Sequence, residues 1–471
     1  MHLKTISLVF LSATTLLNAR TKIACVGDSI TFGSRVKDRE QNSYPAQLGK
    51  MLGDTYEVKN FGKSGATMLD NGNKPYLKTP EFKASLEFNP DIVIIKLGTN
   101  DSKEVNWKHK GNFAASTNKL IAHYQELNSK NGNKPRIILC KPVPVIESGN
   151  FGITEKITRK QVAKAIKIVA LKQNLELIDL HIPLRDKPEW IPDKVHPNAK
   201  GASRIAQHIH RYLTQSREPK TTLNIPWKSS SKSFHGFPLL ESNNGKYKIA
   251  TPRIPAAGNP WIWRARFWSH ESQLDIQMLE LGYHIAYCDV IDLFGSPKAV
   301  KRWNTFYELT QELGLHPKPI LEGMSRGGLI IHNWALANPK KVSGIIADNC
   351  VMDIKSWPAG FAASAGHPKS WKKCKAAYGF RTDQQAKDYL QNPIDHLDKL
   401  KQSNIPLLYI IASDDKIVPP MENSGLAADT LKDHPQLTVI HKPGLGHHPH
   451  SLPNPAPITD FALKCYNLQV K

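Results

Sequence analysis

The sequence predicts an α/β protein made of two different three-layer αβα domains. Short apolar runs alternate with segments of helical periodicity over residues 21–215 and again over residues 235–471, which is typical of parallel sheets covered by helices. The segment 216–234 between them is polar, rich in serine and lysine and without periodicity, so it is expected to be a linker. A length of 471 residues suits two domains. No repeat relates the halves, so a duplication is not expected.

The expected elements follow from runs of β-branched residues and from apolar residues at helical spacing. In the first half, strands are expected at 22–26, 57–60, 91–97, 136–140 and 175–179, with helices at 44–52, 112–128, 158–173 and 202–213. In the second half, strands are expected at 247–251, 284–288, 319–322, 343–348, 406–413 and 437–441, with helices at 272–281, 299–313 and 327–337.

Composition limits the function classes. The chain holds 63 Lys and Arg against 41 Asp and Glu, a net charge of +22. The basic residues are spread evenly, without an Arg-rich arm or a zinc-finger spacing, which argues against a nucleic-acid partner. Either a lysine-rich solvated surface or contact with an acidic polysaccharide remains open. The six cysteines are scattered and show no metal-binding spacing, so buried free thiols are expected (Cys25, Cys140, Cys288, Cys350, Cys374 and Cys465).

The N-terminus has the pattern of a secretory signal peptide over residues 1–20. Lys4 supplies a positive charge, residues 6–17 are mainly apolar, and Ala19 lies at a plausible cleavage point. The apolar run is too short and too rich in hydroxyl groups for a membrane span. A secreted or periplasmic location is therefore expected, without membrane attachment after cleavage.

Four short motifs follow successive expected strands of the first half. Ser29 lies in Gly-Asp-Ser-Ile at the end of the first strand, where open α/β sheets build sites. Gly65 lies in a glycine-containing turn, and Asn100 follows the third strand and could donate a side-chain N–H to an oxyanion. Asp101 is expected to cap the next helix.

The fourth motif is Asp193-Lys-Val-His196. This spacing lets the carboxylate hold one ring nitrogen of His196 while the other nitrogen faces Ser29 as a base.

Taken together, these motifs resemble the SGNH (GDSL-type) hydrolases, and among them the carbohydrate acetylesterases. The resemblance covers residues 21–215. It implies a flavodoxin-like parallel sheet, Ser29 as nucleophile, His196 as base and Asp193 as its orienting acid. It also implies an oxyanion hole built from Ser29 N–H, Gly65 N–H and the Asn100 side chain.

A second nucleophile motif lies in the other half. Ser325 stands in Gly-Met-Ser-Arg-Gly after an apolar strand and before an apolar helix, the context that a nucleophile elbow requires. Asp415, in Asp-Lys-Ile-Val-Pro, is favoured over Asp414 as the acid. His447 follows a glycine after the last strand and is favoured over His448 as the base.

The oxyanion hole of this second site is expected to use two backbone N–H groups, one from Arg326 and one near Trp261. Trp263 and Arg264, in an aromatic and basic run, could form a wall that contacts a sugar and an anion, or could pack in the core. The close histidines 447, 448 and 450 lack accompanying acidic or cysteine ligands, so no metal is expected.

The second half resembles α/β-hydrolases of the prolyl-oligopeptidase-like and carbohydrate-esterase kinds over residues 235–471. Together the halves predict a bifunctional serine carbohydrate esterase that removes O-acetyl or other acyl groups from an anionic polysaccharide, without a cofactor. Alternatives are one active domain with a binding module, a peptidase or a feruloyl or glucuronoyl esterase in the second half, and a non-catalytic glycan-binding protein. The sequence identifies neither the sugar nor the oligomeric state.

Overall fold

The computed structural model describes residues 20–128, 132–147, 149–185, 187–214, 223, 227 and 229–470. Within them the chain forms two compact units. The first comprises 20–140, 147–165 and 190–207, and the second comprises 141–146, 166–189 and the described residues from 208 onward. The expected signal peptide lies outside the described residues, apart from Arg20. None of the helices in the described part of the chain is long and apolar enough to span a membrane.

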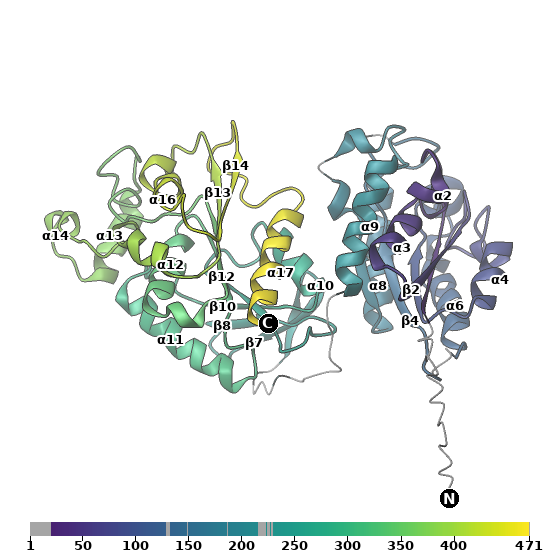
Figure 1. The fold of residues 1–471 in the computed structure, drawn as a ribbon, viewed down its shortest axis with the longest axis horizontal. Helices are drawn as coiled ribbons and strands as arrows, with labels where there is room; N and C mark the ends of the chain where they lie inside the picture. The colour runs from purple at the N-terminus through teal and green to yellow at the C-terminus, as the bar shows by residue number, and fades with distance from the viewer. Residues whose placement is uncertain are drawn as a thin grey trace, which may run out of the picture. The chain divides into compact units, whose positions relative to one another are not determined.

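The first sheet has five strands in the order β2-β1-β3-β4-β5 (Figure 1). The strands are β1 Thr21–Gly27, β2 Tyr56–Gly62, β3 Ile92–Lys96, β4 Arg136–Lys141 and β5 Glu176–Asp179. The pairs β1–β2, β1–β3 and β3–β4 are parallel. All five strands overlap those expected from the sequence, because runs of β-branched residues such as Ile-Val-Ile-Ile in β3 suit a fully buried strand.

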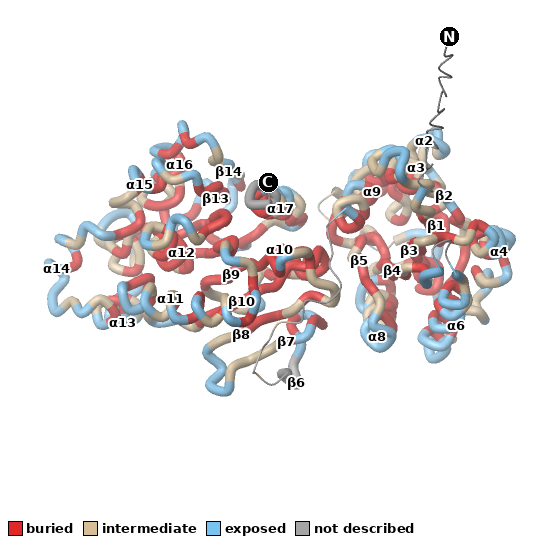
Figure 2. Tube along the Cα trace, turned by 60° about the horizontal axis from the view of Figure 1, so that its bottom comes forward, coloured by how far each residue is buried: buried red, intermediate tan, exposed pale blue. Residues whose placement is uncertain are grey.

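The helices of this half join successive strands. They are α1 Ser29–Phe32, α2 Arg39–Asn42, α3 Tyr44–Leu52, α4 Pro80–Glu87, α5 Glu104–Trp107, α6 Phe113–Gln125, α7 Glu155–Ile157, α8 Ala163–Lys172 and α9 Ala199–Thr214. Each of the longer helices has buried residues and exposed residues (Figure 2). This arrangement places the loops after β1, β2 and β3 at one edge of the sheet, where the sequence motifs lie.

The second sheet has nine strands in the order β14-β13-β12-β11-β9-β10-β8-β7-β6. They are β6 Ser229–Phe234, β7 Phe237–Glu241, β8 Tyr247–Ala250, β9 Trp261–Arg264, β10 His284–Cys288, β11 Ile320–Met324, β12 Gly344–Asp348, β13 Leu407–Ala412 and β14 Leu437–Lys442. The sheet is mixed, because β6, β7 and β8 pair antiparallel with their neighbours while β9 to β14 run parallel. The sequence predicted six of these strands and missed β6, β7 and β9.

The strand β6 lies within the segment that was expected to be a linker. The segment 216–234 was expected to have no regular structure, but its last six residues form β6 and pair with β7. Serine-rich runs carry no apolar alternation, so an edge strand of this composition gives no sequence signal. The described residues of the expected linker before β6 are Leu223 and Trp227, which pack partly buried against the core.

Helices cover both faces of the second sheet (Figure 1). They are α10 Gln273–Glu280, α11 Pro297–Glu312, α12 Gly327–Ala337, α13 Pro368–Tyr378, α14 Asp383–Lys387, α15 Leu397–Gln402, α16 Ser424–Thr430 and α17 Ala456–Val470. On one face, Trp303 of α11 and Trp334 of α12 belong to the same buried hydrophobic cluster as Ile345 of β12. Gly344, the neighbour of Ile345, faces Cys465 of α17 on the other, as strand alternation requires. The expectation for the cysteines is confirmed, since all six are buried and none forms a disulfide bond.

Candidate active sites

Ser29 is the first residue of α1, directly after β1. Asp28 caps this short helix, and its carboxylate accepts a hydrogen bond from Ile30 N at 3.0 Å. The end of β2 lies close to the same turn, because a Cβ added to Gly62 would be only 2.1 Å from Phe32 N. The serine is thus held at the start of a helix, at the carboxyl edge of the sheet, with 7% of its surface exposed.

Asp193, His196 and Ser29 form a hydrogen-bonded relay. His196 Nε2 lies 2.9 Å from Ser29 Oγ, and His196 Nδ1 lies 2.8 Å from Asp193 Oδ2. An ionised carboxylate only accepts hydrogen bonds, so Nδ1 carries the proton and Nε2 presents its lone pair to the serine hydroxyl. The ring of Phe151 lies 5.6 Å from that of His196, between ring centroids. The structure therefore brings together the three residues that the sequence singled out, in the order that nucleophilic catalysis requires.

The charge of Asp193 is stabilised by backbone donors. Its Oδ1 accepts from His196 N at 2.7 Å and from Val195 N at 3.1 Å. Burial raises the pKa of Asp193, but the hydrogen bonds from His196 and Val195 outweigh it and hold that pKa below its ordinary value. Arg35 adds a longer ion pair, 3.6 Å from its Nε to Asp193 Oδ2, and is largely exposed. The carboxylate is thus kept ionised, as an orienting acid must be.

Asn100 and Gly65, the two predicted oxyanion donors, lie on separate loops that the carboxylate of Asp101 connects. Asn100 is buried and donates from its side chain to Ala66 O at 3.2 Å, next to Gly65, whose φ is +83°. Asp101 was expected to cap a helix, but its carboxylate instead accepts from Met68 N and Leu69 N at 2.9 and 2.8 Å. Asp101 therefore holds the loop that carries Gly65 beside Asn100. The two predicted oxyanion donors, the Gly65 N–H and the Asn100 side chain, thus lie on neighbouring loops.

A buried lysine that pairs with the residue before Ser29 was not predicted from the sequence. Lys96 lies in β3, which reads as an apolar run, and its Nζ is 3.0 Å from each oxygen of Asp28. Both side chains are fully buried. Burial lowers the pKa of Lys96 against the opposing effect of Asp28. The sequence signal was a single lysine at the end of an apolar strand, in register with Gly27 of the Gly-Asp-Ser turn.

Ser325 occupies a strained turn between β11 and α12. Its φ is +49°, a left-handed conformation that is rare for a residue with a side chain. The turn is closely packed, because a Cβ at Gly323 would lie 2.7 Å from Ile331 and one at Gly328 would lie 2.6 Å from Val351 O. These glycines let the chain reverse and aim the serine side chain away from the sheet, which is the geometry of a nucleophile elbow.

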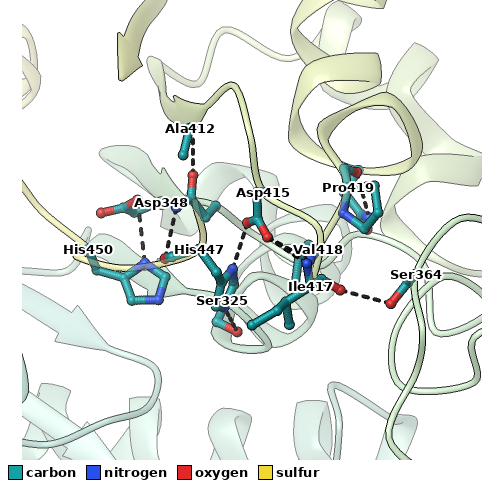
Figure 3. A network of polar contacts seen from close by, with 12 residues as sticks. Ser325, Asp348, Ser364, Ala412, Asp415, Ile417, Val418, Pro419, His447 and His450 are labelled. Carbon is teal, nitrogen blue, oxygen red and sulfur yellow. Dashed lines mark hydrogen bonds and ion pairs between the residues drawn. The ribbon is translucent and has the colours of Figure 1, made fainter. Parts of the chain in front are cut away.

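A second relay joins Ser325, His447 and Asp415 (Figure 3). His447 Nε2 lies 2.9 Å from Ser325 Oγ, and His447 Nδ1 lies 2.6 Å from Asp415 Oδ2. Asp415 Oδ1 also accepts from the backbone N–H groups of the two residues at 417 and 418. Of the alternatives, Asp414 is exposed and accepts from Ser413 Oγ at 2.6 Å, and His448 is exposed. The geometry thus selects Asp415 and His447.

The loop that carries His447 is anchored by a buried ion pair. Lys442 Nζ lies 3.1 Å from Asp348 Oδ1 and 2.9 Å from Pro449 O. Asp348 also accepts from Ser451 N and faces His450 Nδ1 at 3.5 Å (Figure 3). Asp348 ends β12, the strand next to the one that delivers Ser325. This pair therefore ties the histidine loop to the sheet, a role that the sequence did not indicate.

The expected roles of Trp261, Trp263 and Arg264 are corrected by the structure. These residues form β9, a central strand, rather than a loop, and none is more than 1% exposed. Trp263 stacks on Trp303 at 3.9 Å between ring centroids. Arg264 pairs with Asp275 at 2.5 Å, so neither side chain forms a substrate wall. Trp263 and Arg264 are core residues, the alternative that the sequence left open.

The backbone N–H of Trp261 is also at the wrong end of the strand for an oxyanion hole. Ile262 and Arg264 align with Ile320 and Glu322 of the parallel strand β11, so Trp261 lies at the edge opposite Ser325. The chain reaches the serine at the other end of β9, where Arg266 Cβ would be 3.6 Å from a Cβ at Gly327. The segment after Arg264 therefore replaces Trp261 as the candidate donor. Arg326 remains the other, because it directly follows the serine at the start of α12.

Comparison with known proteins finds a family that is similar to the first half. Residues 25–204 match the model of the GDSL-like Lipase/Acylhydrolase family. The resemblance of this half to GDSL-type hydrolases, drawn from its motifs, is confirmed.

Among individual relatives, the chain is 38% identical over 202 residues to an acetylxylan esterase of Xylanibacter ruminicola, an alignment that covers 40% of this chain and 42% of that relative. The chain thus spans less than half the length of this relative. A carbohydrate acetylesterase from Sinorhizobium meliloti is 21% identical, with 41% of this chain and 98% of that chain covered and a TM-score of 0.34. An aryl esterase of M. smegmatis is 19% identical, with the same coverages and a TM-score of 0.35.

Proposed function

We propose that this protein is a serine carbohydrate esterase with two active sites, one in each half, that removes O-acetyl or other acyl groups from a polysaccharide. The observation that carries the proposal is the recurrence of one geometry at two unrelated places. Each serine lies 2.9 Å from a histidine Nε2. Each histidine Nδ1 lies within 2.8 Å of a carboxylate that backbone N–H groups hold in place. Such an arrangement is built for acyl transfer.

The reaction is the same at both sites. The serine oxygen attacks the ester carbonyl as its proton passes to the histidine Nε2, and backbone or amide donors hold the tetrahedral oxygen. The histidine then gives this proton to the departing sugar oxygen, leaving an acyl-enzyme. Water, deprotonated by the same histidine, attacks the acyl-enzyme and releases the carboxylic acid with the serine restored. The residues supply every proton transfer, so the proposal includes no cofactor.

The substrate is proposed to be an acetylated, anionic polysaccharide. The acetylxylan esterase relative supports O-acetyl sugars as the ester for the GDSL-type half. A net charge of +22 supports an anionic polymer. At the second site, Arg326 follows the nucleophile and lies over the rings of Phe294 and Trp357, 5.6 and 5.9 Å from their centroids. A neighbouring cation of this kind favours an acidic sugar or acyl group.

The α/β-hydrolase nature of the second half is part of the proposal. Three features support it. The serine stands at a strained turn between a central strand and a helix, the acid follows a later strand, and the histidine follows the last strand, in the order Ser, Asp, His along the chain. Two sites on one chain would raise the effective concentration of the second site near a polymer already bound at the first. Secretion to the outside of the cell or to the periplasm, directed by residues 1–20, is likewise proposed.

Acetate release from acetylated xylan and from acetylated acidic polysaccharides tests this function. The wild type is compared with Ser29→Ala, Ser325→Ala and the double variant. We expect partial loss of release in each single variant and loss of at least about 10³-fold in the double variant. Abolition of all release by one single substitution would show that only one half is an esterase. Cleavage of peptides that needs Ser325 would instead assign a peptidase to the second half.

A further inference from the structure

Three histidine rings meet at the second site although the proposed hydrolysis uses only one. The ring centroids of His447, His448 and His450 lie 4.9, 4.8 and 5.0 Å apart. The rings are inclined at 76 to 86° to one another, so they surround a common point rather than stack. One ligand nitrogen from each ring lies within 4.8 Å of the other two.

We propose that these three histidines form a reversible binding site for a zinc-class divalent cation, and that the bound ion switches off the Ser325 site. The inhibitory part of this proposal rests on the proposed role of His447 as base. Imidazole nitrogens are the ligands that Zn²⁺ and its neighbours Cu²⁺, Ni²⁺ and Co²⁺ prefer, and three of them with water complete a tetrahedron.

The geometry needs only a small adjustment. Zinc at about 2.1 Å from each nitrogen places tetrahedral ligands about 3.4 Å apart. Nitrogens within 4.8 Å of one another reach that spacing when each ring moves by less than about 1 Å. His448 is exposed and gives an ion access from solvent, while His447 and His450 are buried. The exposed His270, 6.2 Å from His448 between ring centroids, stands where a fourth ligand could come from.

Carboxylates behind the rings suit a cation. The hydrogen bond from His447 Nδ1 to Asp415 is the outer-sphere arrangement that fixes metal-binding histidines and raises their basicity. His450 Nδ1 has no hydrogen-bond partner within the described residues and faces Asp348 at 3.5 Å. Lys442 Nζ also lies 3.1 Å from Asp348 Oδ1 and offsets part of that negative charge, so the support for a cation rests mainly on Asp415.

Inhibition is expected because a bound cation and the Ser325 hydroxyl compete for the same lone pair of His447. His447 Nδ1 donates to Asp415, so Nε2 is the only nitrogen of that ring that can bind a cation. The same lone pair must take the proton of Ser325, which lies 2.9 Å away. A bound cation therefore takes the place of the Ser325 hydroxyl at Nε2, so the hydroxyl must turn away and the base is blocked. No such histidine group exists at the Ser29 site within the described residues, so that site is expected to be insensitive to the ion.

The test uses the full-length protein stripped of metal by a chelator and dialysed. Zinc binding is measured by competition with a chromogenic chelator for the wild type, His448→Gln and His441→Gln. His441 is an exposed histidine on β14 and serves as the matched control. We expect one tightly held zinc in the wild type and His441→Gln, and an affinity at least about tenfold weaker in His448→Gln. Equal zinc affinity in all three proteins would overturn the site.

A second readout tests the switch. Hydrolysis of p-nitrophenyl acetate is followed in a Ser29→Ala background with increasing zinc. We expect inhibition at the concentrations that fill the site, and the His448→Gln change to shift inhibition at least about tenfold upward. Zinc that binds without slowing hydrolysis would overturn the inhibitory role. Absence of hydrolysis without zinc would count against the proposed function alone, because the binding measurement does not depend on it.

Discussion

Lys96 Nζ lies 3.0 Å from both carboxylate oxygens of Asp28, the residue directly before the proposed nucleophile Ser29. Both side chains are fully buried, and Asp28 also caps the helix that Ser29 begins. The lysine further donates to Thr99 Oγ1 at 2.6 Å, next to Asn100. One ion pair therefore fixes the nucleophile turn to the loop with the candidate oxyanion donor.

Removing this lysine should destabilise the first half. Lys96→Met leaves the Asp28 carboxylate buried without its partner, which is expected to cost about 3–5 kcal/mol in the free energy of unfolding. Urea unfolding followed by circular dichroism measures the loss. The control is Lys119→Met, because Lys119 forms an exposed pair with Asp70 at 3.4 Å and should cost less than about 1 kcal/mol. An equal loss of unfolding free energy in the two variants would mean that the buried pair stabilises the fold no more than the exposed one.

Substitutions of the neighbouring Asp415 and Asp414 should affect kcat at the second site very differently. In a Ser29→Ala background, Asp415→Asn removes the acceptor of His447 Nδ1 and is expected to lower kcat by about 10⁴-fold. Asp414→Asn changes only an exposed contact with Ser413 and should leave kcat within about threefold. Hydrolysis of p-nitrophenyl acetate gives both values. A large loss in Asp414→Asn alone would reverse the assignment of the acid.

The lowered pKa of Asp193 predicts that this carboxylate still supports activity at mildly acidic pH. Burial raises this pKa, but hydrogen bonds from His196 and Val195 bring it below the ordinary 3.8. A carboxylate with a lowered pKa stabilises the fold above the unfolded pKa, and this contribution is lost as the pH falls through the lowered value. Asp193 is thus ionised throughout pH 5–8, and the ratio of wild-type to Asp193→Asn activity should stay well above one over that whole range.

Activity of the two proteins, measured in a Ser325→Ala background at intervals from pH 5 to 8, gives this ratio. A ratio that falls toward one below pH 6 would mean that Asp193 takes up a proton there. Arg35→Gln is the control, because Arg35 is largely exposed and 3.6 Å from the carboxylate. It should change activity less than about threefold, as exposed ion pairs contribute little.

Two adjacent glycines at the second nucleophile turn should differ in stability. A Cβ at Gly328 would lie 2.5 Å from Cys350 Cβ and 2.6 Å from Val351 O, so Gly328→Ala forces backbone to move. Gly327→Ala meets its nearest atom, Ala265 Cβ, at 3.4 Å, an ordinary contact. We expect Gly328→Ala to lower the free energy of unfolding by about 1–3 kcal/mol and Gly327→Ala to be near neutral. Thermal unfolding of both variants decides, and equal melting temperatures would contradict the packing argument.

The strands and nucleophile turns could be predicted because their signals are local. Runs such as Ile-Val-Ile-Ile mark buried parallel strands, and Gly-Asp-Ser and Gly-x-Ser-x-Gly mark turns at their ends. The strand β9 was missed because Trp-Ile-Trp-Arg combines bulky aromatics with a charge. Only the tertiary fold shows that Asp275 neutralises Arg264 inside the core.

Contacts between distant residues carried no such signal. The pairing of Lys96 with Asp28 spans 68 residues, and that of Lys442 with Asp348 spans 94. Each lysine reads as an exposed residue until the strands are placed side by side. The convergence of His448 and His450 on His447 likewise depends on how the loop folds. The predicted end of the first domain at 215 stays a prediction, whereas the second sheet begins at β6, before the predicted 235.

The central claim, two serine nucleophiles on one chain, is tested most directly by active-site labelling. The intact protein is treated with a fluorophosphonate, which reacts with serines activated by a neighbouring base, and the modified peptides are mapped by mass spectrometry. The account predicts two adducts for each chain, on Ser29 and Ser325, with the first lost in His196→Ala and the second lost in His447→Ala. A single adduct, or labelling that survives loss of its histidine, would contradict it.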